Sequence, residues 1–250
     1  MNQDTPSTSS DDFQPLVSSR LLRKMAIWIA ALGVITIVLS IGGRTIGERI
    51  VMSGHTDDTS PVSISLNGNA IVIPANAIRF ENQREGGVHK RVDIYFTWPD
   101  LEGYTNENSD HFNRVDKATH LIFLSLSQRT MPMDMSARLE PVYSRLVDGG
   151  DGTKDSGLLA YAFSEDTRYS GEILYVGARD NGPAFAARCL REEGLPAGSH
   201  PCMRDVDVGR DMSVTYRFSR NLLPEWRRLD AAIKAYIDGS INEPRDKSAS

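Results

Sequence analysis

The sequence predicts a mainly β domain with one C-terminal α-helix, preceded by one N-terminal transmembrane helix. Three observations support this fold class. Residues 25–43 carry no charge, several short alternating apolar runs separated by Gly, Asn and Asp follow them, and the apolar period becomes helical near residue 222. Many short strands joined by such turns are typical of an antiparallel β-sandwich-like domain.

The uncharged segment 25–43, MAIWIAALGVITIVLSIGG, is long enough to cross a bilayer. As a helix it would be about 28 Å long, and the hydrocarbon core of a bilayer is about 30 Å thick. A core helix of a soluble domain normally has a polar face, and a cleaved signal peptide has a shorter apolar region and a small-x-small cleavage site. Neither pattern is present, so we predict an uncleaved signal anchor whose partner is the lipid bilayer.

The charges beside this segment predict its orientation. Arg20, Arg23 and Lys24 precede it, whereas Arg44 and Arg49 follow it. Lys and Arg favour the cytoplasmic side of a membrane. We therefore predict a single-pass protein of the inner (plasma) membrane, with a cytoplasmic N-terminus and a periplasmic C-terminal domain.

The predicted organisation has five parts. Residues 1–24 are a disordered cytoplasmic tail, because their Ser, Thr and Asp content leaves too little apolar surface to bury. The span at 25–43, a spacer at 44–60, a periplasmic β-rich domain at 61–239 and a frayed tail at 240–250 follow.

The net charge of −5 belongs to the part after the span, because the tail and span contain three bases and three acids. A mildly acidic domain without a basic stripe argues against nucleic-acid binding.

The first strands are predicted from turn chemistry and alternation. Residues 61–74, PVSISLNGNAIVIP, contain Asn67-Gly68 between two apolar runs, which is a strong hairpin signal because both turn positions need positive φ. Residues 92–98, VDIYFTW, alternate and predict a half-buried strand. Residues 120–127, HLIFLSLS, are apolar on both faces and predict a central strand.

The later strands follow the same logic. Residues 157–164 and 171–178, GLLAYAFS and GEILYVGA, predict a hairpin, and residues 212–218, MSVTYRF, alternate as a strand. The segment 136–150 stays open, since Pro141 suits either the first turn of a short helix or an edge strand.

One helix is predicted at 222–238. Its apolar residues recur at spacings of three and four, which forms one stripe that we expect to pack on the sheet of the same domain. Pro224 suits the first turn, Glu225 favours the positive N-terminal end, and Gly239 suits the residue that stops the helix.

Signatures of catalysis, cofactor binding and metal binding are missing from the sequence. It has no Gly-x-Ser-x-Gly, Ser-x-x-Lys or His-Glu-x-x-His motif and no phosphate-binding P-loop. The acidic stretch 148–157, DGGDGTKDSG, lacks the ligand spacing of a calcium loop and is better interpreted as a hairpin loop. We therefore expect no catalytic residue, no cofactor and no metal ligand, and a protein that is not an enzyme.

The loop 98–113 is the most suggestive irregular stretch. Asp100, Glu102, Asp110 and His111 lie there near the aromatic residues Trp98 and Tyr104, a combination that could bind a sugar or a metal. The alternative is a polar surface loop between strands. We name these four residues a speculative ligand loop.

Cys189 and Cys202 are the only two cysteines. A zinc site needs more ligands than the nearby His200 supplies, and a catalytic dithiol would more typically be Cys-x-x-Cys. In the periplasm two cysteines around a short Gly/Pro loop favour a structural disulfide. Free thiols and a metal site remain as alternatives.

One resemblance to known proteins rests on two parts of the chain. They are the N-terminal span and the residues from Arg188 onward, which include RCLREEG and PCMRDVDVGRDMSVTYRFSRNLLPEWRRLDAAIKAYI. The chain resembles single-span membrane-anchored envelope proteins of alphaproteobacteria. The resemblance covers the span and the C-terminal part but not the middle of the chain. It implies an inner-membrane anchor and an envelope location, and it carries over no catalytic residue.

These expectations combine into one functional hypothesis. A bitopic inner-membrane protein displays a periplasmic β-rich domain that acts as an interaction or assembly module, with an envelope protein as its partner. The alternative is an envelope hydrolase or carbohydrate-binding protein that uses the 98–113 loop. A thiol-redox protein, with a labile bond between Cys189 and Cys202, is a third hypothesis.

Overall fold

The computed structural model describes residue 20 and residues 23–37, 54–149, 152–191, 199 and 201–242. The chain divides into two compact units, Met1–Ser53 and Gly54–Ser250.

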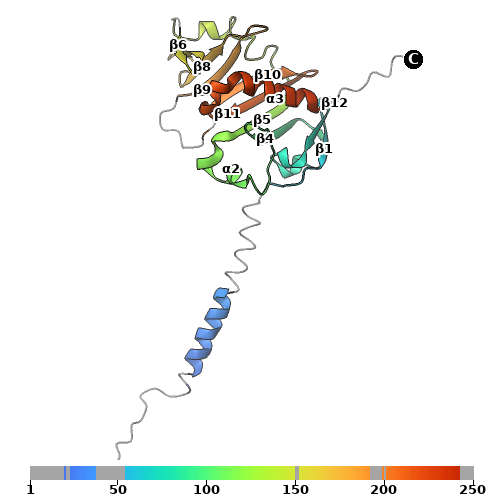
Figure 1. Cartoon of the computed structure of the whole chain (residues 1–250), viewed down its shortest axis with the longest axis vertical. Helices are drawn as coiled ribbons and strands as arrows, with labels where there is room; N and C mark the ends of the chain where they lie inside the picture. The colour runs from blue at the N-terminus through green and yellow to red at the C-terminus, as the bar shows by residue number, and fades with distance from the viewer. Residues whose placement is uncertain are drawn as a thin grey trace, which may run out of the picture. The chain divides into compact units, whose positions relative to one another are not determined.

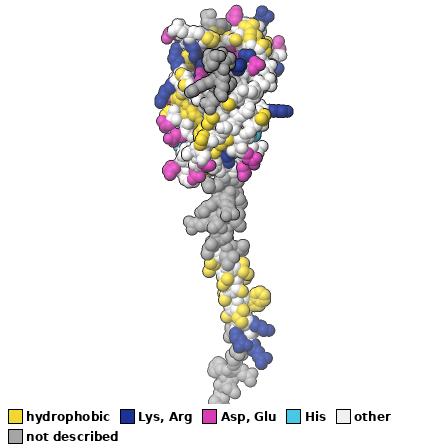
Figure 2. Space-filling model, turned by 90° about the vertical axis from the view of Figure 1, so that its right-hand side faces the viewer, with side chains coloured by type: hydrophobic (Ala, Val, Ile, Leu, Met, Phe, Trp, Pro, Cys, Tyr) yellow, Lys and Arg dark blue, Asp and Glu magenta, His cyan; other side chains and the backbone are white. Residues whose placement is uncertain are grey.

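In the first unit, residues 23–37 form an α-helix with exposed side chains (Figure 1). Figure 2 shows hydrophobic side chains along this helix and Lys and Arg side chains at its N-terminal end. Residues 38–43 of the expected span lie outside the described residues. In the part of the chain that the structure describes, no helix is long and apolar enough to cross a membrane.

Within the described residues of the second unit, the strands form two sheets. The long sheet has eight strands in the order β4-β5-β11-β10-β9-β8-β7-β6, and each neighbouring pair is antiparallel. Its strands are β4 (Arg91–Thr97), β5 (Leu121–Gln128), β6 (Thr153–Asp155), β7 (Leu158–Ala162), β8 (Glu172–Gly177), β9 (Phe185–Leu190), β10 (Cys202–Val208) and β11 (Met212–Phe218).

The small sheet has the order β12-β2-β1-β3. Its strands are β1 (Pro61–Leu66), β2 (Asn69–Pro74), β3 (Gly87–His89) and β12 (Ile241–Asn242). The predicted hairpin is confirmed, because β1 and β2 pair across Asn67 and Gly68, whose φ angles are 49° and 79°. β1 and β3 pair in parallel, which departs from the antiparallel prediction.

The main core lies between the two sheets and the helix α3 (Trp226–Ser240). Apolar side chains of β1, β2, α3 and the inner face of the long sheet form one buried cluster. In Figure 1, α3 lies across the long sheet and the small sheet follows at its C-terminal end. The mainly β prediction with a C-terminal helix is confirmed.

The C-terminal helix begins later than predicted. Residues Arg220–Glu225 form a 3-10 turn, η5, which contains Pro224, and α3 starts at Trp226. The apolar stripe packs on the domain's own sheets as expected, with Leu229, Ile233 and Ile237 buried. Gly239 lies inside α3 and does not stop it.

The expectation of a frayed tail from residue 240 is wrong for Ile241 and Asn242, which pair with β2 as β12. Residues 243–250 lie outside the described residues. Backbone hydrogen bonds also tie part of the expected spacer to the domain, since Asn76 N donates to Asp58 O at 2.7 Å.

Two strand predictions are confirmed by pairing, and one burial prediction is wrong. β5 lies between β4 and β11, and β7 and β8 form the later hairpin. β4 was expected to be half-buried, yet Asp93 and Tyr95 on its outer face are also buried. Loop segments cover those two residues, which strand alternation alone does not show.

The segment left open by the sequence, 136–150, forms neither a strand nor an α-helix over its described residues. It is a series of turns with a 3-10 turn η4 (Tyr143–Arg145). Met135 and Tyr143 pack with Phe163, Leu174 and Ala186 in a second buried cluster. Since Leu174 and Tyr175 point to opposite faces of β8, this segment covers the outer face of the long sheet over β7 to β9.

The remaining short elements complete the loops. They are the α-helix α2 (Ser109–Asn113) and the 3-10 turns η1 (Ala75–Ala77), η2 (Glu81–Gln83) and η3 (Val115–His120). α2 and η3 lie in the connection between β4 and β5, and η1 and η2 lie between β2 and β3.

Candidate functional site: the open face of the long sheet

The outer face of β4, β5 and β11 carries polar side chains in rows across the strands. Asp93, Ser125 and Thr215 are directly paired neighbours and form the middle row. Inward-facing residues of the same strands, such as Leu124 and Val214, belong to the main core. We call this outer surface of β4, β5 and β11 the open face.

A hollow of about 400 Å³ lies on the open face. Side chains of the three strands line it together with Arg79, which follows η1 in the chain. The polar and aromatic residues at the hollow are Arg79, Arg91, Asp93, Phe123, Ser125, Ser127, Thr215 and Arg217. Its volume is in the range of small-molecule sites or of pockets that hold single side chains of a partner.

Asp93 forms the polar floor of the hollow and is fully engaged within the protein. Ser125 Oγ donates to Asp93 Oδ1 at 2.8 Å, and Arg91 Nε donates to Asp93 Oδ2 at 2.9 Å. Gln83 Nε2 donates to the same carboxylate at 3.3 Å, and its Oε1 accepts from the Asp93 backbone N–H. These contacts compensate the burial of the carboxylate, as a buried charge requires.

Arg79 is held by aromatic rings. Its guanidinium carbon lies 5.1 Å from the ring centroid of Phe80 and 5.1 Å from that of Phe123. Such cation–π contacts orient a guanidinium without neutralising its charge.

Among the described residues, Arg79 has no carboxylate within ion-pair distance, and Arg217 on β11 has none either. Counting Arg79, Arg91 and Arg217 as +3 and Asp93 as −1 gives the hollow a charge of +2. The hollow is therefore a positive site within a domain whose overall charge is negative.

The acids on the neighbouring strand β10 do not neutralise this site, because each already has its own arginine. Arg138 forms an ion pair with Asp205. Arg129 Nη1 lies 3.1 Å from Asp207 Oδ2. Both arginines come from the segment after β5.

An aromatic cluster lies at the β4 side of the open face, around Tyr95. His55 Nδ1 lies 2.9 Å from the Tyr95 hydroxyl, and the His55 ring stacks on Tyr104 at 4.8 Å between centroids. Phe112 packs edge-on against Tyr95 at 4.8 Å. Burial first, and then the positive charges of Arg84 and Arg79, lower the pKa of His55, which favours its neutral form.

All four residues of the speculative ligand loop lie in the part of the chain that the structure describes. Asp110 forms an ion pair with Lys117, and His111 Nδ1 lies 3.1 Å from the Lys117 backbone oxygen. Asp100 and Glu102 are exposed. Within the described residues, no group of three or more His, Cys, Asp or Glu side chains is placed to hold a metal ion.

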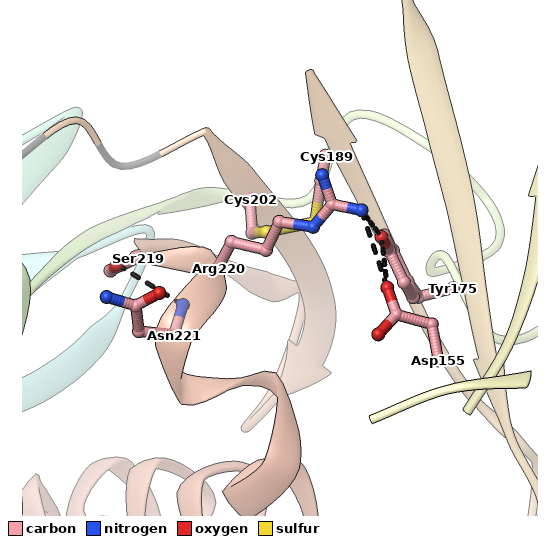
Figure 3. The surroundings of a disulfide bond; sticks show 7 residues. All are labelled: Asp155, Tyr175, Cys189, Cys202, Ser219, Arg220 and Asn221. Carbon is pink, nitrogen blue, oxygen red and sulfur yellow. Dashed lines mark hydrogen bonds and ion pairs between the residues drawn. A yellow bond between two sulfur atoms is a disulfide. The ribbon is translucent and has the colours of Figure 1, made fainter. Parts of the chain in front are cut away.

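The disulfide is confirmed between Cys189 and Cys202. The two residues are directly opposed on the neighbouring strands β9 and β10, and both are buried. Figure 3 shows Arg220 extending beside the disulfide toward Tyr175 and Asp155. Tyr175 donates its hydroxyl proton to Asp155 Oδ2 at 3.0 Å.

Sequence reasoning missed the hollow, although part of its signal was visible. Arg91 and Asp93, Ser125 and Ser127, and the residues of β11 each follow the period of two that marks one strand face. The sequence does not show that these three strands are neighbours, because β11 follows β5 only after more than eighty residues.

No family model matches the chain, and no curated protein matches it. Two solved structures are similar in fold. The first is Smlt3025, an immunity protein of the Stenotrophomonas maltophilia type IV secretion system, with a TM-score of 0.52 and 17% identity over 77% of this chain and 98% of that one. The second is the Neisseria meningitidis iron-regulated outer membrane lipoprotein FrpD, with a TM-score of 0.47 and 13% identity over 76% and 96% of the two chains.

Proposed function

We propose that this protein is a single-span inner-membrane protein of the kind seen in alphaproteobacterial envelopes, and that its periplasmic domain binds another envelope protein through the open face. The observation that carries the binding role is the open face itself. Although Asp93 and Tyr95 on β4 are buried, the outer side chains of β5 and β11 stay partly or fully accessible among the described residues, and the face holds a charged hollow.

The chemistry of the described residues supports binding more than catalysis. In the hollow Ser125 donates to Asp93, but Arg91 and Gln83 also hold that carboxylate, and none of the described residues that line the hollow is a His or Lys that could act as a base. No group of three or more His, Cys, Asp or Glu side chains is placed to hold a metal ion among the described residues. Arginine and aromatic side chains are enriched in protein interfaces, and both occur here. The likeness to Smlt3025, an immunity protein of a secretion system, is compatible with this role as a fold-level analogy.

The anchor and the compartment rest on separate observations. The 25–43 segment is uncharged, and its described part exposes apolar side chains such as Ile27, Trp28 and Ile29. The Cys189–Cys202 disulfide supports an oxidising compartment such as the periplasm.

Photo-crosslinking in living cells tests the binding role. A photoreactive residue placed at Ser127 on the open face of the full-length chain is expected to give a discrete adduct with another protein. The matched control places the same residue at Ala235 on the exposed side of α3, where no adduct is expected. Equal labelling from both positions would remove the support for a binding face.

Reporter fusions test the anchor independently. Alkaline phosphatase, which needs an oxidising compartment for its disulfides, is expected to be active when fused after residue 250 and inactive when fused after residue 20. Arginine at both Leu32 and Ile35 should abolish membrane retention, since each charge costs about 3 kcal/mol at a span centre. The reverse reporter pattern would refute the proposed orientation.

A further inference from the structure

We infer that the hollow on the open face binds carboxylate groups of an acidic segment of the partner protein. This inference rests on the proposed function and names the chemistry of the partner. The charge of the hollow supports it, because a hollow with a charge of +2 in a domain of negative overall charge attracts an anionic group.

The hollow offers hydrogen-bond donors that the protein leaves unused. Arg79 and Arg217 have no carboxylate partner in the described residues, and both side chains are exposed. Ser127 and Thr215 line the same hollow, and their hydroxyls have no hydrogen-bond partner among those residues. Two guanidinium groups and two hydroxyls are donors that suit carboxylate oxygens.

The position of Arg79 prepares it for this role. The guanidinium carbon of Arg79 lies 5.1 Å from the ring centroids of both Phe80 and Phe123. The side chain is therefore partly ordered before a ligand binds, which lowers the entropy lost on binding. On the neighbouring strand, Arg217 is the direct pair of Phe123 and therefore lies on the same row. A carboxylate between the two arginines would meet charge from both sides.

The floor of the hollow is itself acidic. Asp93 lies among the arginines, and its carboxylate accepts hydrogen bonds from Arg91, Ser125 and Gln83. It repels an anion that reaches the floor, so we expect a ligand carboxylate to lie at Arg79 and Arg217 rather than beside Asp93.

The aromatic rim favours a polypeptide. The Phe80 side chain is 40% exposed beside Arg79, and it offers apolar contact to the methylene groups of Glu or to a neighbouring apolar residue of a partner segment. Arginine with an aromatic ring is the usual composition of an interface hot spot.

Binding of a labelled peptide to the full-length chain in zwitterionic nanodiscs tests the inference. The probe is a fluorescein-labelled peptide of alternating Glu and Ser, and its neutral counterpart has Gln for Glu. We expect saturable binding of the acidic peptide, weakening as salt rises, and no binding of the neutral peptide. Arg79→Gln and Arg217→Gln should each weaken binding by roughly tenfold, the change expected for one lost charge-assisted hydrogen bond.

The matched control removes the same charge elsewhere. Arg145→Gln with Arg210→Gln changes two exposed arginines that do not line the hollow, and it should leave the affinity within about twofold. Equal loss in this control, or unchanged binding in the Arg79/Arg217 double variant, would overturn the inference. So would an absence of binding by the unmodified chain.

Two further outcomes separate this inference from the proposed function. If Ser127 crosslinks a protein in cells and the Arg79/Arg217 double variant still crosslinks it, the open face binds a partner that is not acidic. Binding of the unmodified chain to anionic phosphatidylglycerol vesicles, lost in the double variant, would assign the hollow to lipid headgroups and overturn the peptide inference.

Discussion

Arg204 on β10 and Asp230 on α3 form a buried ion pair, with 2.8 Å between Arg204 Nε and Asp230 Oδ1. Tyr216 also donates its hydroxyl proton to this carboxylate, at 2.5 Å, and Arg179 pairs with its other oxygen. The side chains of Arg204 and Asp230 are only 4% and 7% exposed. This network fixes where the C-terminal helix lies on the long sheet.

Removing one partner of this pair should strongly destabilise the domain. Asp230→Ala leaves the Arg204 charge buried without its partner, and we expect a loss of about 3–5 kcal/mol in the free energy of unfolding. Urea unfolding followed by tryptophan fluorescence measures it. The control Asp238→Ala breaks the exposed pair with Lys234 on the same helix and should cost less than about 1 kcal/mol. Similar losses in the two variants would contradict the role of the network.

The disulfide should stabilise the fold without being required for the open face. Cys189 and Cys202 are 13 residues apart in sequence, and closing a loop of this size stabilises a protein by about 3 kcal/mol in the chain-entropy model. We expect the Cys189→Ala/Cys202→Ala double variant to lose about that amount in urea unfolding. Mass spectrometry without reductant should find the crosslinked peptides in the natural chain. Free thiols in the intact protein would contradict both the bond and the proposed compartment.

Alkaline pH should destabilise the domain partly through Tyr175. Burial first, and then its hydrogen bond to Asp155, raise the pKa of Tyr175 to about 12. In the unfolded chain a tyrosine loses its proton near pH 10, so between about pH 10 and 12 the folded state holds more protons and stability falls as pH rises. The Tyr175→Phe variant should lose less stability over this range. The same pH slope in both proteins would contradict the shift.

Two glycines should respond in opposite ways to a methyl group. A Cβ at Gly177 on β8 would lie 2.6 Å from Trp226 Cζ2 and 2.7 Å from Leu158 Cδ2, so Gly177→Ala should cost about 1–3 kcal/mol by overpacking the core. A Cβ at Gly239 on α3 meets nothing within 4 Å, and Gly239→Ala should stabilise the helix by up to about 1 kcal/mol. Thermal unfolding of the two variants compares them directly. If Gly177→Ala left the stability unchanged, this would show that Trp226 can move to make room for the methyl group.

The sequence predicted those elements whose pattern lies within one short segment of the chain. Asn67-Gly68 predicted the first hairpin because positive φ is a property of those two residues. The apolar stripe of the C-terminal helix predicted its buried face because the helical period repeats within one segment. The start of the helix was predicted too early, since Pro224 fits both the first turn of an α-helix and the 3-10 turn that the structure shows.

The segment 136–150 and the strand β4 show where sequence reasoning stopped. Residues of the first make turns that are fixed by packing against Phe163 and Leu174 rather than by a period of their own. The outer face of β4 is buried by residues from other parts of the chain, His55 among them. Neither burial can be derived from alternation along one strand.

By itself the sequence determined the uncharged segment 25–43, the β-rich character, the hairpin at Asn67-Gly68 and the helix that follows η5, because each depends on residues close together in the chain. It favoured a disulfide between its two cysteines over free thiols or a metal site, and the structure placed them opposite each other on β9 and β10. Only the tertiary structure decided that β11 lies beside β5 and that Arg79 reaches the hollow. Strand neighbours far apart in sequence are chosen by the burial of the whole core, and the charged hollow exists only once that choice is made.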